Sequence, residues 1–102
     1  MTTISTTNGI NVEQLLGTID AIKADDQLGV FTFRASTLWE NGTYNKGSIH
    51  GFTHAGMEDE SRTTPFELEG DEPPVLLGSN KGPNAVELLV QALGFCYSVG
   101  FI

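Results

Sequence analysis

Cysteine is nearly absent from the chain, whose 102 residues include only Cys96. One cysteine cannot form a disulfide within the chain, whereas small secreted domains usually depend on several paired cysteines. The first ten residues lack Lys and Arg, and they lack the apolar segment of a signal peptide. We therefore expect a reducing compartment and predict a cytoplasmic location.

Basic residues are also scarce, since five Lys and Arg stand against thirteen Asp and Glu, giving a net charge of −8. Binding to a nucleic-acid backbone needs a clustered basic surface, and so does binding to an anionic membrane. Long apolar runs are missing too, because Glu87 and Gln91 interrupt the longest one, residues 86–102. The sequence predicts an acidic protein that binds neither nucleic acid nor membranes.

The N-terminal region predicts an amphipathic helix over residues 11–23. Asn11 is a favoured N-cap, and Gln14 three residues later completes a capping-box pattern. Apolar residues recur at helical spacing, at Val12, Leu15, Leu16, Ile19 and Ile22. We expect this helix to pack on a larger element, with binding to a partner as the alternative.

The middle of the chain predicts an antiparallel sheet of about three strands. Residues 30–39 alternate with a period of two, and residues 48–54 and 65–68 supply the second and third strands. Asn41-Gly42 is a hairpin signal of type I′, although the returning strand is clear only from about Gly47, which leaves a longer loop open. Residues 57–62 are expected to form a loop, and residues 75–77 an extended segment before the glycine-rich connection 78–83.

The last predicted element is a helix that is apolar on nearly every side from Val86 onward. Asn84 and Glu87 form a second capping-box pattern at its start. A helix without a polar face is expected to be buried by other elements or by a partner chain. It reaches Ile102 without a cap, which indicates an interrupted domain. The predicted fold class is therefore α+β, with a long buried apolar helix, in one domain over residues 1–102.

Cys96 is the main candidate for chemistry, because a thiolate is a nucleophile when a cation lies beside it. The alternative is a structural cysteine that packs as a small apolar group. Glu87 precedes Cys96 by nine residues, which places the two on opposite sides of one helix, so Glu87 is first a cap. The cations that the fold could bring to Cys96 are Lys23, Arg34, Lys46, Arg62 and Lys81.

No cofactor or metal site is predicted. His50 and His54 would lie about 13 Å apart along one strand, too far to bind one metal ion together. The glycine-rich connection 78–83 lacks the spacing of a phosphate-binding loop.

Several segments form a recognisable combination: residues 72–78 (EPPVLLG), 82–89 (GPNAVELL) and 92–96 (ALGFC), with residues 31–35 (FTFRA), Trp39 and Gly42 upstream. Together they resemble the OsmC/Ohr family, in a longer-chain branch with an added N-terminal helix. The resemblance covers nearly the whole chain but only about the first half of the family domain. We therefore expect the chain to be the N-terminal portion of an OsmC-like domain.

The resemblance implies an intertwined homodimer with a central helix at its interface. It also implies a peroxiredoxin-like activity in oxidative or osmotic stress, in which a cysteine matching Cys96 reduces organic hydroperoxides. A second cysteine then condenses with the oxidised one, and an external dithiol restores both. The alternative is a non-catalytic OsmC-like dimer that binds a small apolar ligand, with Cys96 structural.

The chain departs from the family pattern in three places. It has no second cysteine, and Val86 occupies the position at which peroxidase members carry a catalytic Glu, one residue before Glu87. No residue is the obvious equivalent of the arginine that activates the thiolate. Lys46, Arg62 and Lys81 are the candidates for that role.

Overall fold

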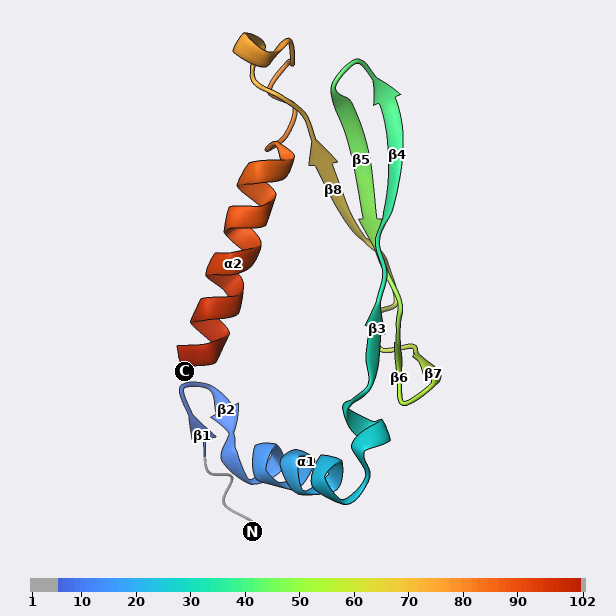
Figure 1. Cartoon of the computed structure of the whole chain (residues 1–102), viewed down its shortest axis with the longest axis vertical. Coiled ribbons are helices and arrows are strands. Elements are labelled where there is room, and N and C mark those ends of the chain that lie inside the picture. The colour runs from blue at the N-terminus through green and yellow to red at the C-terminus, as the bar shows by residue number, and fades with distance from the viewer. Residues whose placement is uncertain (1–5, 102) are drawn as a thin grey trace.

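The computed structural model describes residues 6–101, which form two α-helices, eight short strands and two 3-10 helices (Figure 1). The helices are α1 (Val12–Ala24), α2 (Ala85–Phe101) and the 3-10 helices η1 (Asp26–Gly29) and η2 (Pro74–Leu76). The strands are β1 (Thr6–Thr7), β2 (Ile10–Asn11), β3 (Phe31–Phe33), β4 (Ser36–Asn41), β5 (Tyr44–Ile49), β6 (Phe52–His54), β7 (Met57–Asp59) and β8 (Phe66–Gly70).

The strands form three small antiparallel sheets, so the prediction of one sheet of about three strands is wrong. The sheet orders are β1-β2, β3-β6-β7 and β4-β5-β8. The first two long strands predicted are each split, at residues 34–35 and 50–51. At the break Arg34 pairs with Glu58, whose carboxylate occupies the place that a Cβ on residue 51 would take. Gly51 is thus the point where the strands leave one sheet and enter the next.

Two tight turns have a positive φ at both central residues, as a type I′ hairpin requires. Asn8 and Gly9 have φ of 50° and 80°, and they join β1 to β2. Ala55 and Gly56 have φ of 52° and 80°, and they join β6 to β7. The second turn makes residues 57–59 a strand, where the sequence predicted a loop.

The hairpin predicted at Asn41-Gly42 is confirmed, but its turn is displaced by one residue. Asn41 pairs with Tyr44, so Gly42 and Thr43 are the central residues, and the register shifts between Trp39 and Asn41. The returning strand begins at once, and the longer loop is not formed.

The predicted N-terminal helix is confirmed over Val12–Ala24. The Asn11 side chain accepts a hydrogen bond of 2.9 Å from the backbone N–H of Gln14, which is the expected N-cap. Its apolar stripe stays largely exposed, because within residues 6–101 the main contacts of α1 are with η1 and β2, which are both short.

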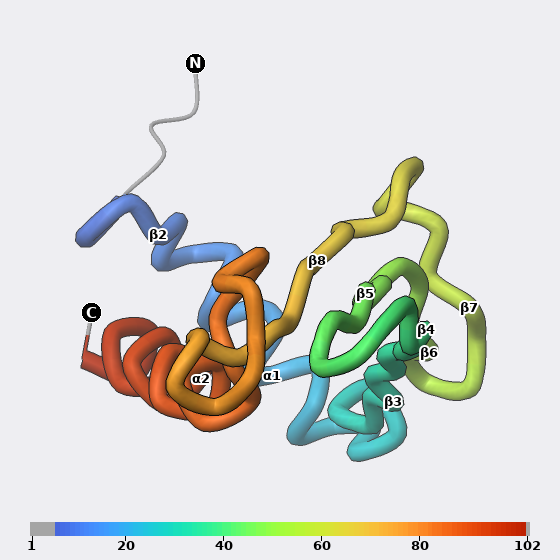
Figure 2. Tube along the Cα trace, turned by 90° about the horizontal axis from the view of Figure 1, so that it is seen from above, coloured from blue at the N-terminus to red at the C-terminus, as the bar shows by residue number. Residues whose placement is uncertain are grey.

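The start of α2 is also confirmed, but its predicted burial is wrong. Glu87 N–H donates to Asn84 Oδ1 at 2.9 Å, and Asn84 N–H donates to Glu87 Oε1 at 3.1 Å. From residue 91 to Phe101 every residue of the helix is exposed. The reason is the direction of the helix: α2 begins near the end of β8 and then runs away from the sheet β4-β5-β8 instead of lying across its face (Figures 1 and 2).

The link from β8 to α2 is held by Asp71, the one buried residue among residues 6–101, at 3% exposure. Its carboxylate accepts hydrogen bonds from the Thr43 hydroxyl and from the backbone N–H groups of Glu72, Ser79 and Lys81. The carboxylate therefore joins the β4-β5 hairpin to both ends of the loop 72–81. Within this loop η2 replaces the extended segment that was predicted over residues 75–77.

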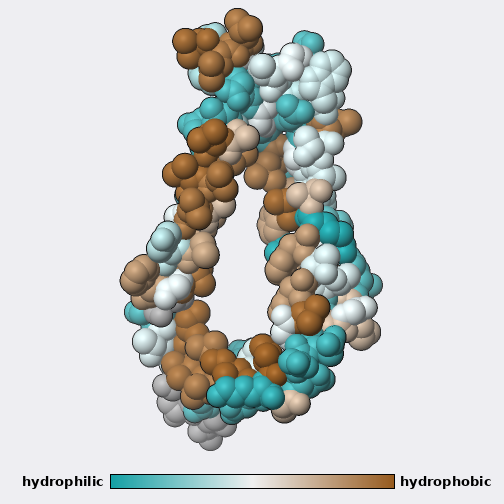
Figure 3. All heavy atoms as spheres, in the orientation of Figure 1, coloured by the Kyte–Doolittle hydropathy of each residue, from teal (hydrophilic) through white to brown (hydrophobic). Residues whose placement is uncertain are grey.

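No apolar side chain of the described residues is buried, and the molecule is an open frame. Its radius of gyration is 18.5 Å, whereas a compact chain of this length has one of about 13 Å. Figure 3 shows an opening through the frame, with apolar residues along its α2 side. The predicted α+β fold around a buried helix is thus corrected to a mixed arrangement of two helices and three small sheets.

We predict that Gly82→Ala destabilises the chain by about 1–3 kcal/mol, the usual cost of overpacking. A Cβ on residue 82 would overlap the carbonyl oxygen of Glu69, a backbone atom that cannot move alone. Gly17→Ala is the matched control, since nothing lies within 4 Å of its new Cβ. In mid-helix it should stabilise by about 0.5–1 kcal/mol. Urea unfolding measures the change in the free energy of unfolding for both substitutions. Equal changes would refute the close approach of residue 82 to the carbonyl oxygen of Glu69.

We also predict that Asp71 contributes stability that depends on pH. The hydrogen bond from Thr43 and the surrounding backbone N–H groups lower the pKa of Asp71 from 3.8 to about 2. A lowered pKa in the folded state stabilises above the unfolded value, so this contribution is complete above pH 3.8 and is lost as the pH falls towards about 2. Asp71→Asn should be less stable than the native chain near neutrality, and the difference should shrink between pH 4 and pH 2. A difference that stays constant over that range would contradict the role of the carboxylate.

Candidate functional site

Cys96 lies in the second half of α2 and is exposed. The residues three and four positions away on the helix are Ala92, Leu93, Val99 and Gly100, none of which is polar. Among residues 6–101 the thiol has no hydrogen-bond partner and no disulfide partner. The chain therefore presents its single thiol on an apolar surface that solvent and small molecules can reach.

Glu87 is used at the start of α2, where its carboxylate accepts from Asn84 N–H. The Asn84 side chain in turn donates to Glu72 Oε2 at 3.3 Å. The N-terminal end of α2 is thereby connected to the loop that Asp71 holds. Glu87 acts as a cap in the chain, as the sequence predicted.

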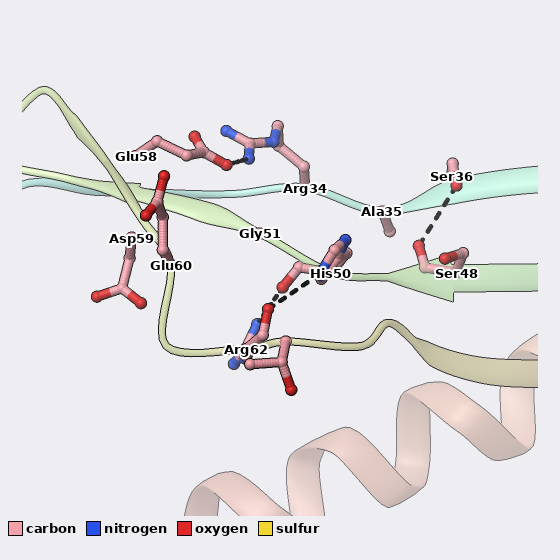
Figure 4. A pocket seen from close by; sticks show the side chains of 11 residues that line it. Arg34, Ala35, Ser36, Ser48, His50, Gly51, Glu58, Asp59, Glu60 and Arg62 are labelled. Carbon is pink, nitrogen blue, oxygen red and sulfur yellow. Dashed lines mark hydrogen bonds and ion pairs between the residues drawn. The ribbon is translucent and has the colours of Figure 1, made fainter.

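Arg62 lies on the strand side of the molecule, in the segment between β7 and β8. Its guanidinium carbon lies 4.9 Å from the centre of the Phe52 ring and 5.3 Å from that of Phe66. Nη1 donates to the carbonyl oxygen of His50 at 3.3 Å, and the His50 ring bonds the carbonyl oxygen of Arg62 at 3.0 Å (Figure 4). Arg62 therefore has a fixed position in which its charge is satisfied by aromatic faces and one carbonyl.

The two candidate lysines have different surroundings. Lys81 Nζ lies 4.6 Å from the centre of the Tyr44 ring. Lys46 is on β5, opposite Leu38 on one side and Glu69 on the other. Both lysines belong to the region around the β4-β5 hairpin.

A polar cleft of about 640 Å³ lies where β3 and β4 meet β5 and β6. Figure 4 shows Arg34 and Glu58 paired on one side of it and His50 with Arg62 on the other. Its further lining residues are Ala35, Ser36, Ser48, Gly51, Asp59, Glu60 and Thr63. The cleft thus combines two arginines and a histidine with three carboxylates.

Asp59 is held in its charged form within this cleft. The Ser61 hydroxyl and then the Ser61 backbone N–H donate to its carboxylate, and these bonds lower the pKa of Asp59. A carboxylate that stays ionised suits the positioning of a cationic or hydrogen-bonding group.

The structure does not bring the predicted site residues together in one chain. Cys96 is not among the residues that line the cleft, and it shares no hydrogen bond with Glu87, Arg62 or Lys46 within residues 6–101. Sequence reasoning missed the pair Arg34–Glu58, because the partners are 24 residues apart and Glu58 was expected in a loop. The Ala55-Gly56 pair was the available signal, since a turn there pairs Glu58 with Thr53 on β6, the strand next to β3, after which Arg34 follows in the chain.

His50 and His54 bond different carbonyl groups, and His54 Nε2 lies 2.6 Å from the Leu28 oxygen. Over the described part of the chain no three metal-binding side chains come together. None of the helices in residues 6–101 has the length and apolarity needed to cross a membrane.

No protein-family model matches the chain, and no curated protein matches it. The thiol on α2 and the polar cleft on the strands are therefore the features from which a function can be argued.

Proposed function

We propose that the chain is a subunit of an OsmC-like thiol-dependent peroxidase that reduces organic hydroperoxides in the cytoplasm, under oxidative or osmotic stress. The observation that carries the proposal is the exposed thiol of Cys96 on an apolar helix surface. The resemblance of residues 72–96 to the OsmC/Ohr family points to the same residue, because Cys96 matches the cysteine that reacts with hydroperoxides in that family. An apolar surface around the thiol suits a hydroperoxide with an apolar substituent.

The proposed reaction begins with the Cys96 thiolate, which attacks the outer oxygen of the hydroperoxide. The O–O bond breaks, the alkoxide takes up a proton to become an alcohol, and the cysteine becomes a sulfenic acid. An external thiol then condenses with the sulfenic acid, releasing water and leaving a mixed disulfide. A second thiol of the same dithiol reductant displaces Cys96 as a thiol and carries away the oxidised reductant.

The thiolate needs a cation beside it, and the helix face around Cys96 supplies none. In the proposal a second copy of the chain supplies it, from the arginines of its polar cleft. Arg62 suits this role because aromatic rings and a carbonyl hold it, but no carboxylate pairs with it in the described residues. Lys46 is the second candidate, while Arg34 is already paired with Glu58.

The exposed surface supports the homodimer that this arrangement requires. The chain exposes 8303 Å², whereas a folded monomer of its mass exposes about 5,600 Å². The excess is about 2,700 Å² per chain, hence about 5,400 Å² for a pair, which lies at the upper end of the range that obligate homodimers bury. Each large apolar side chain covered in this way contributes about 1.5–3 kcal/mol.

The chain lacks a second cysteine, so the sulfenic acid of Cys96 has no resolving partner within it. We therefore expect slow turnover that depends on the external thiol. A missing carboxylate is a second reason to expect slow turnover. The family pattern has its catalytic Glu at the position of Val86, next to the cap Glu87.

We predict that cumene hydroperoxide without added thiol adds one oxygen atom to Cys96, and that little sustained turnover follows. A dithiol such as dithiothreitol should restore the thiol and permit slow turnover. Intact-mass spectrometry and peptide mapping measure the first step, and consumption of hydroperoxide measures the second.

Cys96→Ser is the control, and it should abolish both the mass increase and the turnover. If Cys96 remains unmodified while the chain binds the hydroperoxide or its alcohol, the peroxidase is refuted in favour of a dimer that binds a small apolar ligand. Rapid turnover without external thiol would refute the proposed dependence on a reductant.

A further inference from the structure

The loop between β8 and α2 carries three successive aliphatic side chains on Val75, Leu76 and Leu77, which with Pro74 we call the apolar knob. Val75 is 85% exposed and Leu77 is 91% exposed. Figure 3 shows the knob as the apolar projection at the top of the frame. An exposed apolar projection of this kind is typical of an interaction surface.

Hydrogen bonds hold the knob in one conformation. Leu77 N–H donates to the carbonyl oxygen of Pro74 at 2.9 Å, and Gly78 N–H donates to that of Pro73 at 3.0 Å. The Asp71 carboxylate fastens the loop on both sides of the knob, at Glu72 and at Ser79. A preorganised projection loses little conformational entropy when it binds.

Leu77 adopts φ of +71°, in the left-handed region that a bulky side chain seldom occupies. The strain is not relieved by burial within the chain, since the side chain is exposed. Backbone strain of this kind persists where the surrounding structure enforces it, and it is most frequent at functional positions.

The knob and α2 differ in net charge from the rest of the chain. Residues 73–101 contain only Lys81 and Glu87 as charged residues and are neutral overall, so the net charge of −8 lies entirely on the first 72 residues. Two copies of an acidic chain repel each other through most of their surface. A contact through the neutral segment 73–101 avoids most of this repulsion.

We propose that the knob of one copy packs against α2 of a second copy. The knob cannot reach along its own α2, because that helix starts beside the knob and runs away from it (Figure 1). In a two-fold dimer each contact occurs twice, so both knobs and both helices are covered together. This inference rests on the homodimer of the proposed function and names the surface that forms it.

The surface of α2 offers what the knob needs. Eight of its large apolar side chains are more than half exposed, namely Val86, Leu89, Val90, Leu93, Phe95, Tyr97, Val99 and Phe101. A single charge, Glu87, lies on the helix, and it is engaged with Asn84 at the start. The knob and α2 are therefore alike in being apolar, uncharged over most of their length and exposed.

The test places photoreactive benzoylphenylalanine at position 77 of the full chain and mixes ¹⁴N-labelled with ¹⁵N-labelled copies before irradiation. We expect mixed-isotope cross-links from position 77 to residues 85–101. The same probe at Met57, which is 74% exposed on β7, is the matched control and should give no such links. Cross-links that fall elsewhere, or only within one copy, would overturn the inference.

A second measurement uses Leu77→Asn, because Asn tolerates the left-handed conformation and the variant should fold. We expect the dimer dissociation constant, measured by sedimentation, to rise at least tenfold, while Met57→Asn leaves it unchanged. An unchanged constant in Leu77→Asn would overturn the knob contact and leave the homodimer standing. A native chain that sediments as a monomer would overturn both.

Discussion

The Asp71 carboxylate is the constraint on which the rest of the structure depends. It accepts from the Thr43 hydroxyl and from three backbone N–H groups of the loop between β8 and α2. A buried carboxylate must be satisfied in this way, and four donors satisfy it. The loop is thereby fixed against the β4-β5 hairpin, which sets the direction in which α2 leaves. The same loop presents the apolar knob, so one side chain determines both surfaces through which we propose that two copies meet.

An open frame without a buried apolar side chain is the main consequence of that direction. The apolar residues are present, but α2 carries them away from the strands instead of folding over them. Hydrophobic burial is the chief favourable term in folding, and the dimer that we propose would bury much of this surface. The thiol of Cys96 and the arginines of the polar cleft lie on separate parts of the frame. A second copy is the simplest means of bringing them together.

Local signals in the sequence predicted the local structure well. Asn11 and Gln14 gave the start of α1, Asn84 and Glu87 gave the start of α2, and Gly42 marked the hairpin. Burial and sheet organisation were not predictable in the same way, because they depend on contacts far apart in sequence. An all-apolar helix indicates that something should cover it, but not that the same chain does so. The Arg34–Glu58 pair, the division of the strands at Gly51 and the separation of Cys96 from Arg62 all depend on such distant contacts.

The central claim is that the chain is one half of an assembly held by its neutral apolar segment. Sedimentation equilibrium at micromolar concentration, in low and in high salt, tests this most directly. The account predicts twice the 11.0 kDa mass of one chain. It also predicts association that is at least as strong in high salt, because salt screens the repulsion between the acidic surfaces. A single-chain mass under both conditions, or a dimer that salt dissociates, would contradict it.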